Sequence, residues 1–568
     1  MKSPLLAMSL ATVAFLTPEA QDRSQTRSMV LSRDGIVASE HPLASQAGAT
    51  VLAQGGHAVD AALAANAMMS VTAPMMCGPG GDLFALVYDA KTGQTFGLNA
   101  SGWAPQALNA EYLRRLGHTN MPQSGIHSVT VPGAVDGWLA LHRRFGKIGL
   151  KQVLAPAILT AEQGVPLTEW VAAYWKESEA KLRTNAECAR VYLPQNRAPR
   201  VGEVFKNPDL ARTYQRIAKS KRAGFYAGST ARAFLKLSRE LKGTITSADL
   251  DAFTSEWVTP ISTDYRGWTV QEIPPGGQGI AALLMLNIME TFPLKGYGAG
   301  SADTIHTIIE AKKLAYADLL QYIADPRQAK VPTTHLLSKA YAHARAKLIH
   351  PSRAMTGPEP GRPFHPGTDT TYLCAVDAEG NMVSWIQSIY SGFGSALVPE
   401  GTGVLLHNRA GLFSLESGHP NELAGRKRPL HTIIPAMMIK DSRRIAFGIM
   451  GGFNQAQAHA QFVSHIADFG LNIQEALEAP RFTKLTFAGR DIRIEDRVPA
   501  AVREELKRRG HELQVQGPFS SVVGGGQAVM RDESTGVNYG ASDPRKDGAA
   551  LPQPFWTRQS SAASPRKR

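Results

Sequence analysis

Cysteine is scarce in this chain, which has only three in 568 residues: Cys77, Cys188 and Cys374. Three widely separated cysteines cannot build a disulfide framework, and none stands at the spacing of a metal site. We therefore expect them to be small buried hydrophobic residues. The histidines also lack a metal-ligand spacing, so the sequence predicts no bound metal.

Long apolar runs are almost as rare. Residues 5–16 form the one clear run, preceded by Lys2 and followed by a small-residue cleavage site ending at Ala20. This pattern is typical of a signal peptide over residues 1–20, and it predicts export to the periplasm or secretion. The alternative is a merely buried or disordered N-terminus. No other run approaches the 20 or so apolar residues of a membrane span, so we expect no stable membrane association.

Acidic residues are in the minority, with 48 against 61 basic ones and a formal charge of +13. A nucleic-acid-binding protein would gather this excess on one face. Here the basic residues are dispersed, with small clusters at 426–428, 508–509 and 566–568. We expect a solvated surface and a frayed basic C-terminus rather than a nucleic-acid partner.

The sequence also lacks linkers: no Pro/Ser-rich or low-complexity block divides residues 35–550. Length alone would suggest three or four domains. With 43% hydrophobic and 19% charged residues, the chain instead fits one large α/β unit with a sizeable core.

Hydrophobic periodicity indicates alternating helices and strands. Helices are predicted over residues 41–52, 58–71, 135–144, 153–163, 208–217, 280–289, 302–321, 454–469 and 473–479. Strands are predicted over residues 35–39, 83–88, 268–273, 371–376, 382–388, 403–406, 433–439 and 445–449. The helix at 58–71 is apolar nearly all round, which predicts a position between layers. Two sheets between two helical layers would bury all these apolar faces.

Thr370 and Thr371 open a predicted hairpin, 371–376 and 382–388, that follows a polar, Pro/Gly-rich stretch at 325–369. That stretch is expected to be an exposed, cleavable connection. A cut between Asp369 and Thr370 would give Thr370 a free α-amino group beside its own hydroxyl, so that nucleophile and base share one residue. The alternative is an ordinary β-branched pair in a strand.

Several separated motifs, in order, resemble the γ-glutamyltransferase family of N-terminal-nucleophile hydrolases. They are Pro274-Pro-Gly-Gly, Thr370-Thr-Tyr, Arg426-Lys-Arg-Pro-Leu, Gly451-Gly and Gly540-Ala-Ser-Asp-Pro-Arg. The resemblance implies an α+β fold, a four-layer αββα sandwich built from both fragments of a self-cleaving precursor. The fragments would be a large subunit, 21–369, and a small subunit, 370–568. No cofactor is implied.

The resemblance also assigns roles. Thr370 would be the nucleophile and, through its free amine, the base. Ser388 stands where the family has a second hydroxyl that hydrogen-bonds the nucleophile, and Gly451 and Gly452 match the oxyanion hole. Such backbone donors can each contribute about 3–4 kcal/mol of transition-state stabilisation.

The chain departs from the family at the residues that grip the glutamyl group. Ser101 replaces the arginine that pairs with the α-carboxylate, and the segment that carries the acidic ammonium partner reads Arg409-Ala-Gly-Leu412. His431-Thr432 replaces a pair of serines, and Tyr390 replaces an asparagine. These changes make glutathione doubtful and favour a substrate without the zwitterionic head, with Arg409 holding an anionic group from another direction.

Three functions follow from these residues. The first is a self-processing γ-glutamyltransferase or glutathione hydrolase-like amidase, which passes an acyl group from Thr370 to water or an amine. The second is a cephalosporin or glutaryl acylase, or an oxamate-type hydrolase, on the same scaffold. The third is an inactive binding protein that retains the fold.

Overall fold

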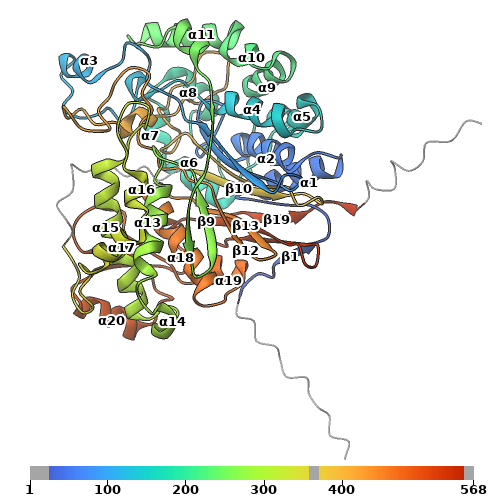
Figure 1. The fold of residues 1–568 in the computed structure, drawn as a ribbon. Coiled ribbons are helices and arrows are strands. Elements are labelled where there is room, and N and C mark those ends of the chain that lie inside the picture. The colour runs from blue at the N-terminus through green and yellow to red at the C-terminus, as the bar shows by residue number, and fades with distance from the viewer. Residues whose placement is uncertain (1–24, 357–369, 556–568) are drawn as a thin grey trace, which may run out of the picture.

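The computed structural model describes residues 25–356 and 370–555, drawn as the coloured ribbon in Figure 1. The predicted signal peptide and Asp369 lie outside these residues. The described part of the chain forms two large sheets stacked face to face, with helices covering both outer sides (Figure 1).

The Thr370 sheet has seven antiparallel strands, with the hairpin near its centre. In spatial order they are β19 (Ala549–Pro552), β2 (Ile36–Ser39), β10 (Thr371–Val376), β11 (Met382–Ser388), β3 (Asp82–Asp89), β4 (Gln94–Ala100) and β7 (Glu256–Val258). The second sheet contains β1 (Val30–Ser32), β18 (Val537–Ser542), β17 (Gly526–Asp532), β13 (Arg443–Ile449), β12 (Ala436–Lys440), β9 (Trp268–Glu272) and β8 (Ile261–Tyr265). Residues before 357 and after 369 contribute strands to both sheets.

The two helical layers confirm the predicted four-layer αββα sandwich. The outer face of the Thr370 sheet packs against α1 (Pro42–Ala53), α2 (Ala58–Thr72) and α4 (Ala134–Phe145), with α5 (Leu150–Gln163) packed on α2 and α9 (Pro208–Ser220) packed on α5. The second sheet packs against α13 (Gly279–Met289), α18 (Gln455–Ala467) and α19 (Ile473–Glu478), with α15 (Ala302–Tyr322) packed on α13 and α18.

Shorter elements decorate this frame. The remaining helices are α3 (Ala110–Arg115), α6 (Glu169–Glu177), α7 (Glu179–Leu182), α8 (Ala186–Tyr192), α10 (Ala223–Tyr226), α11 (Gly228–Glu240), α12 (Ser247–Ala252), α14 (Leu294–Tyr297), α16 (Thr333–Leu336), α17 (Lys339–Ala346) and α20 (Ala500–Arg508). Two small sheets pair β5 (Val165–Pro166) with β6 (Val204–Phe205), and β15 (Asp491–Glu495) with β14 (Phe482–Thr483) and β16 (Glu512–Gln516). Within residues 25–356 and 370–555 the 3-10 turns are η1 (Ile126–Ser128), η2 (Arg409–Leu412), η3 (Gly452–Asn454) and η4 (Ser521–Val523).

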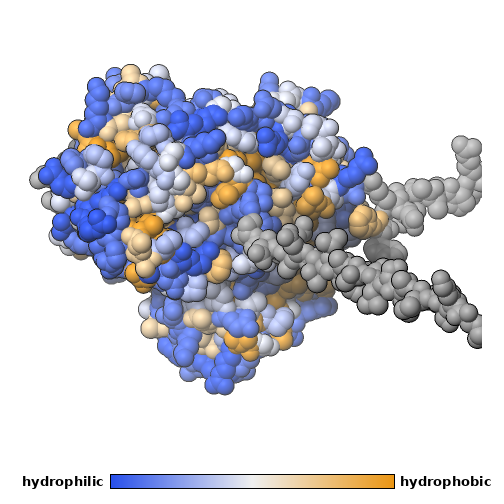
Figure 2. Space-filling model, turned by 90° about the horizontal axis from the view of Figure 1, so that it is seen from below, coloured by the Kyte–Doolittle hydropathy of each residue, from blue (hydrophilic) through white to orange (hydrophobic). Residues whose placement is uncertain are grey.

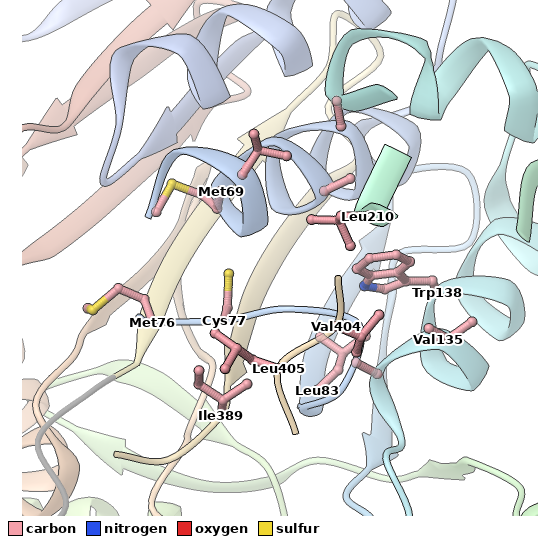
Figure 3. Packing of buried hydrophobic residues seen from close by; sticks show 14 of the residues in the cluster. Met69, Met76, Cys77, Leu83, Val135, Trp138, Leu210, Ile389, Val404 and Leu405 are labelled. Atoms are coloured by element: carbon pink, nitrogen blue, oxygen red, sulfur yellow. The ribbon is translucent and has the colours of Figure 1, made fainter. Parts of the chain in front are cut away.

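Helix α2 is buried along its whole length, as its all-round apolar sequence predicts. Figure 3 shows the packing at its end, where Met69 lies near Cys77 and Trp138 faces the cluster from α4. The indole Nε1 of Trp138 donates to Asn66 Oδ1 at 3.0 Å and to Gln387 Oε1 at 2.9 Å. This one donor therefore connects α4 to both α2 and β11. All three cysteines are free and buried, which confirms their predicted role.

The predicted strand at 403–406 is wrong. Its residues lie outside both sheets, and Leu406 makes only an isolated bridge to Leu397. The segment packs against a glycine loop instead: a Cβ on Gly80 would lie 2.1 Å from the carbonyl oxygen of Leu405. A short apolar run can be buried by a loop as well as by a sheet, so the sequence pattern could not separate the two.

The stretch from 325 to 356 is more structured than an open connection. It contains α16 and α17, and the side chains of Leu336 and Ala342 are buried in the core beneath them. Buried apolar residues at helical spacing explain this difference. Residues 357–369 lie outside the described part of the chain.

Hydrophilic residues dominate the face shown in Figure 2, with hydrophobic ones in small separate areas. No helix of the described chain has the length and apolar character needed to cross a membrane. The basic cluster at 426–428 is not simply solvated, because Arg428 is buried and its guanidinium bonds Glu256 and the carbonyl of Ser101.

The two sheets approach closely where Gly448 of β13 faces the ring of Tyr372 in β10. A Cβ on Gly448 would lie 2.4 Å from two ring atoms of Tyr372. Nearby, the Phe447 carbonyl lies 3.5 Å from Ser384 Oγ, and Ser384 pairs with Cys374. Phe447 thus lies near Cys374, and Gly448, the next residue of β13, lies near Tyr372. The chain direction of β13 therefore points toward the Thr370 end of β10.

We predict that Gly448→Ala lowers the free energy of unfolding by about 1–3 kcal/mol, because the added methyl group overpacks the space between the sheets. Urea unfolding measures the change. Gly517→Ala is the matched control, since a Cβ there meets no atom within 4 Å. Equal midpoints for the two variants would contradict the close approach at Gly448.

Candidate active site

Strand register places Thr370 opposite Ser388. Thr371 pairs with Gln387 across the hairpin, so the next pair outward is Thr370 and Ser388. The Thr370 hydroxyl donates to Ser388 Oγ at 3.2 Å, and both side chains are almost completely buried. The two hydroxyls that the sequence singled out therefore meet at the open end of the hairpin.

The loop Gly78–Asp82 brings a third strand to this end. In the β3–β11 pairing Asp82 stands opposite Ser388. A Cβ on Gly81 would lie 2.4 Å from the Ser388 carbonyl oxygen, so only glycine permits this approach. The glycine cluster thus fixes the position of Asp82 relative to the hydroxyl pair.

Gly451 and Gly452 lie between β13 and α18. Because β13 runs toward the Thr370 end of β10, the turn that follows it reaches the same end of the sandwich. Gly451 has a φ of +126° and Gly452 a φ of +57°, conformations that favour glycine. Within the described residues neither amide donates a hydrogen bond, and both precede α18, where the helix dipole is positive. This geometry suits the stabilisation of a developing negative charge.

Gln278 fixes the outer side of this turn. Its amide nitrogen donates to the carbonyl of Gly452 at 2.8 Å and to that of Thr432 at 2.5 Å. The hydroxyl of Tyr316 in turn donates to Gln278 Oε1 at 2.7 Å. The Gln278 bond holds the peptide between Gly452 and Phe453. The peptide that carries the Gly452 N–H is held by its Gly451 carbonyl, which accepts from the Asn454 amide at 2.9 Å, so this N–H is preorganised.

A chain of contacts leads from the hydroxyl pair to Arg409. The amide of Tyr390, which has a φ of +78°, donates to Ser388 Oγ at 2.8 Å. The guanidinium of Arg409 lies 4.6 Å from the centre of the Tyr390 ring, and its Nη1 donates to Thr432 Oγ1 at 2.8 Å. Four residues predicted separately therefore form one connected cluster beside Thr370.

Asp82 is the centre of that cluster, and sequence reasoning missed its role. Its Oδ2 lies 3.3 Å from His407 Nδ1, 3.2 Å from Arg409 Nε and 3.1 Å from His431 Nε2, and all four side chains are buried. Burial alone would raise the pKa of Asp82, but the two imidazoles hold this pKa well below its usual range. In the sequence, Asp82 is a single carboxylate after the glycines of residues 78–81, a pattern typical of an ordinary turn.

Arg409 has an unused donor. Nε is engaged by Asp82 and Nη1 by Thr432, whereas the buried Nη2 has no hydrogen-bond partner among the described residues. Burial lowers the pKa of Arg409, with Asp82 acting in the opposite direction. A buried guanidinium nitrogen without a partner is costly, and an anionic ligand would satisfy it.

Ser101 follows β4 and lies on another side of this region. Its carbonyl accepts from Arg428 Nε at 2.8 Å, and its buried hydroxyl has no partner among the described residues. Ser101 and His431 both line a cavity of about 210 Å³, together with Glu256 and Arg428. No hydrogen bond or ion pair joins Ser101 directly to Arg409 within the described chain.

Three potential metal ligands, His306, Glu310 and His511, gather away from the site. The two imidazoles share a hydrogen bond of 2.8 Å. Glu310 accepts from Lys313 Nζ at 2.7 Å and from the Met355 amide at 2.8 Å. This cluster ties α15 to the chain that leads toward residue 356, and its carboxylate is already engaged by two donors.

Comparison with known proteins gives a consistent result. The sequence model of the family described as gamma-glutamyltranspeptidase matches residues 44–553. The glutathione hydrolase-like YwrD proenzyme of Bacillus subtilis is 36% identical, covering 92% of this chain and 99% of the relative. An oxamate amidohydrolase proenzyme of Klebsiella pneumoniae is 33% identical, covering 92% and 98%. The structure of a cephalosporin acylase from Bacillus halodurans superimposes with a TM-score of 0.88 at 41% identity, covering 94% and 99%.

We predict that His431 contributes to the pH dependence of stability. Burial, reinforced by Arg409, lowers its pKa to about 3. The folded protein therefore excludes a proton that the unfolded chain binds below about pH 6.5, and stability falls as the pH drops. Between pH 6 and pH 4 one such histidine adds about 1.4 kcal/mol per pH unit to the slope of the unfolding free energy.

His431→Gln should remove that part of the slope in urea unfolding, because glutamine can still donate to Asp82 but does not titrate. The exposed His343 provides the control variant, His343→Gln. An unchanged slope for His431→Gln would show that His431 is not held neutral in the folded protein.

Proposed function

The chain belongs to the gamma-glutamyltranspeptidase family and is an enzyme of that family, and from this premise we propose that it cleaves itself before Thr370 and then hydrolyses amides through an acyl-enzyme on that residue. We propose further that its acyl group carries an anion but no ammonium group, as in glutaryl amides or in oxamate, the amide of oxalate. The observation that carries the proposal is the unbroken line of contacts from Thr370 through Ser388 and Tyr390 to the unpartnered Nη2 of Arg409.

The self-processing step is supported by the position of Thr370 and by relatives that are named proenzymes. Attack of the Thr370 hydroxyl on the preceding carbonyl would form an ester and release the α-amino group, and water would then hydrolyse the ester. An α-amino group has an unperturbed pKa of about 7.7–8.0, which suits a base at neutral pH. Strands from both fragments interleave in both sheets, so the cut pieces would stay together.

In turnover, the Thr370 oxygen attacks the substrate carbonyl while its own amine takes the proton. The oxyanion faces the amides of Gly451 and Gly452, the C–N bond breaks, and the proton passes to the leaving amine. Water or a second amine then attacks the ester. Ser388, held by the Tyr390 amide, is placed to orient the nucleophile through its hydroxyl.

Charge at the acyl end favours an anion over a zwitterion. A γ-glutamyl group needs a carboxylate for its ammonium, but the nearby Asp82 is already surrounded by Arg409, His407 and His431. Leu412 stands where the family resemblance places the acidic partner, and it is fully buried among apolar residues. The free Nη2 of Arg409 can bind a carboxylate, so oxamate-type and glutaryl amides fit better than glutathione.

Export is a separate proposal, supported by the signal-peptide pattern of residues 1–20. It predicts a working environment outside the cytoplasm, in the periplasm or beyond the cell. The catalytic proposal does not depend on it.

Thr370→Ala is expected to remain one chain and to be inactive. The wild-type protein should separate in denaturing electrophoresis into fragments of about 38 and 21 kDa, scaled by length from 61.2 kDa after removal of the signal peptide. Thr370→Ser keeps a hydroxyl and should still mature. A Thr370→Ala protein that matures normally would exclude Thr370 as the processing nucleophile.

Arg409→Gln should lower kcat/KM for the best anionic amide in a panel of γ-glutamyl, glutaryl and oxalyl substrates by about 10- to 150-fold, the loss expected for one charged hydrogen bond. Amides with a neutral acyl group of similar length should change much less. Arg232→Gln, at an exposed arginine, is the control. Efficient γ-glutamyl turnover that Arg409→Gln leaves unchanged would overturn the proposed substrate class.

A further inference from the structure

A second cavity, of about 410 Å³, opens beside Gly451. One wall comes from Trp170, Tyr174 and Glu177 of α6, which precede the proposed cleavage site. The other wall includes Gly451, Arg493 and Lys546, which follow it. The cavity therefore borders a proposed oxyanion donor and is completed only when both fragments are present.

Side-chain hydrogen bonds hold α6 in place beside the cavity, one before its first residue and one after its last. Its N-cap residue, Thr168, donates from Oγ1 to Asp547 Oδ2 at 2.6 Å. Beyond its C-terminus, Lys181 of α7 donates to the carbonyl of Gly392 at 2.6 Å, two residues after Tyr390. The segment α6–α7 thus spans from the loop that carries Lys546 to the loop that carries Tyr390. The aromatic wall of the cavity is held in a fixed position relative to the catalytic residues.

The lining combines flat aromatic surface with positive charge. The rings of Trp170 and Tyr174 lie with centroids 5.5 Å apart. Lys546 is only 6% exposed, and its ammonium lies 3.7 Å from the centre of the Trp170 ring. Arg493 adds a second cation, and the one acidic side chain of the lining, Glu177, is exposed at the rim. Such a lining suits a planar body that bears a carboxylate.

We infer that this cavity is the subsite for the amine side of the substrate, and that it takes amines with an aromatic or other planar body and an anionic group. The inference rests on the proposed function. Arg409 receives the acyl end by way of Tyr390, so a carbonyl held at Gly451 directs its leaving nitrogen away from Arg409 and toward the cavity. The amine that departs when the C–N bond breaks, and any acceptor amine that attacks the Thr370 ester, occupy the same place.

The test keeps the acyl group constant and changes only the amine. Using the acyl group that the substrate panel finds most reactive, amides of 3-aminobenzoate, aniline and methylamine are compared on processed protein. The 3-aminobenzoate amide should have the highest kcat/KM. Lys546→Gln should raise KM for that amide about tenfold and leave the aniline and methylamine amides nearly unchanged, and Lys546→Arg should restore most of the loss. Trp170→Leu should weaken both aromatic amides but not the methylamide.

Lys176→Gln is the control, an exposed lysine on α6 that does not line the cavity. Appearance of both fragments and an unchanged melting temperature show that each variant folds. Product inhibition gives a second readout: 3-aminobenzoate should inhibit wild-type protein more strongly than aniline, and Lys546→Gln should abolish the difference.

The possible failures are distinguishable. If no amide is hydrolysed at Thr370, the proposed function itself fails. If amides are hydrolysed but the three amines are equivalent, or if Lys546→Gln slows all three equally, the function stands and the subsite assignment is overturned.

Discussion

The register of the β10–β11 hairpin is the constraint on which the rest of the site depends. It sets Thr370 opposite Ser388 at the end of two fully buried strands near the centre of a seven-stranded sheet. A slip of one residue would turn every side chain of the strand to the other face, which neither core could accept. The hydroxyl pair is therefore positioned by apolar packing on both sides of the sheet and not by local contacts alone.

The same packing explains how residues far apart in sequence reach one site. Tyr372 occupies the space above Gly448, which lets β13 deliver Gly451 and Gly452 to the Thr370 end. Asp82 follows a loop that packs against Ser388 and has room only for glycine at position 81. Its carboxylate contacts Arg409, His407 and His431, which lie more than 300 residues later in the sequence. Removing a partner from a buried carboxylate costs several kcal/mol of stability, so Asp82 holds Arg409 and the two histidines in place on the acyl side of the site.

The sequence predicts the strands and helices better than the residues of the active site. The hairpin was placed to the residue because its strands alternate around a turn whose Gly380 has a φ of +87°. The apolar run 403–406 was misread as a strand because burial by a glycine loop leaves the same pattern. Asp82 was missed because its partners are set by tertiary structure, and the wall built by Trp170 and Lys546 joins residues 376 positions apart. Thr370 itself would read as an ordinary strand residue without the family resemblance.

If Thr370 becomes an N-terminal residue whose hydroxyl carries the acyl group, the acyl-enzyme can be trapped and located. Mature protein is mixed with its best amide, quenched in acid, and mapped by peptide mass spectrometry. The expected result is a fragment that begins at Thr370 and carries one acyl group on that residue. An acyl group on another residue, or an uncut chain that still turns over substrate, would contradict it.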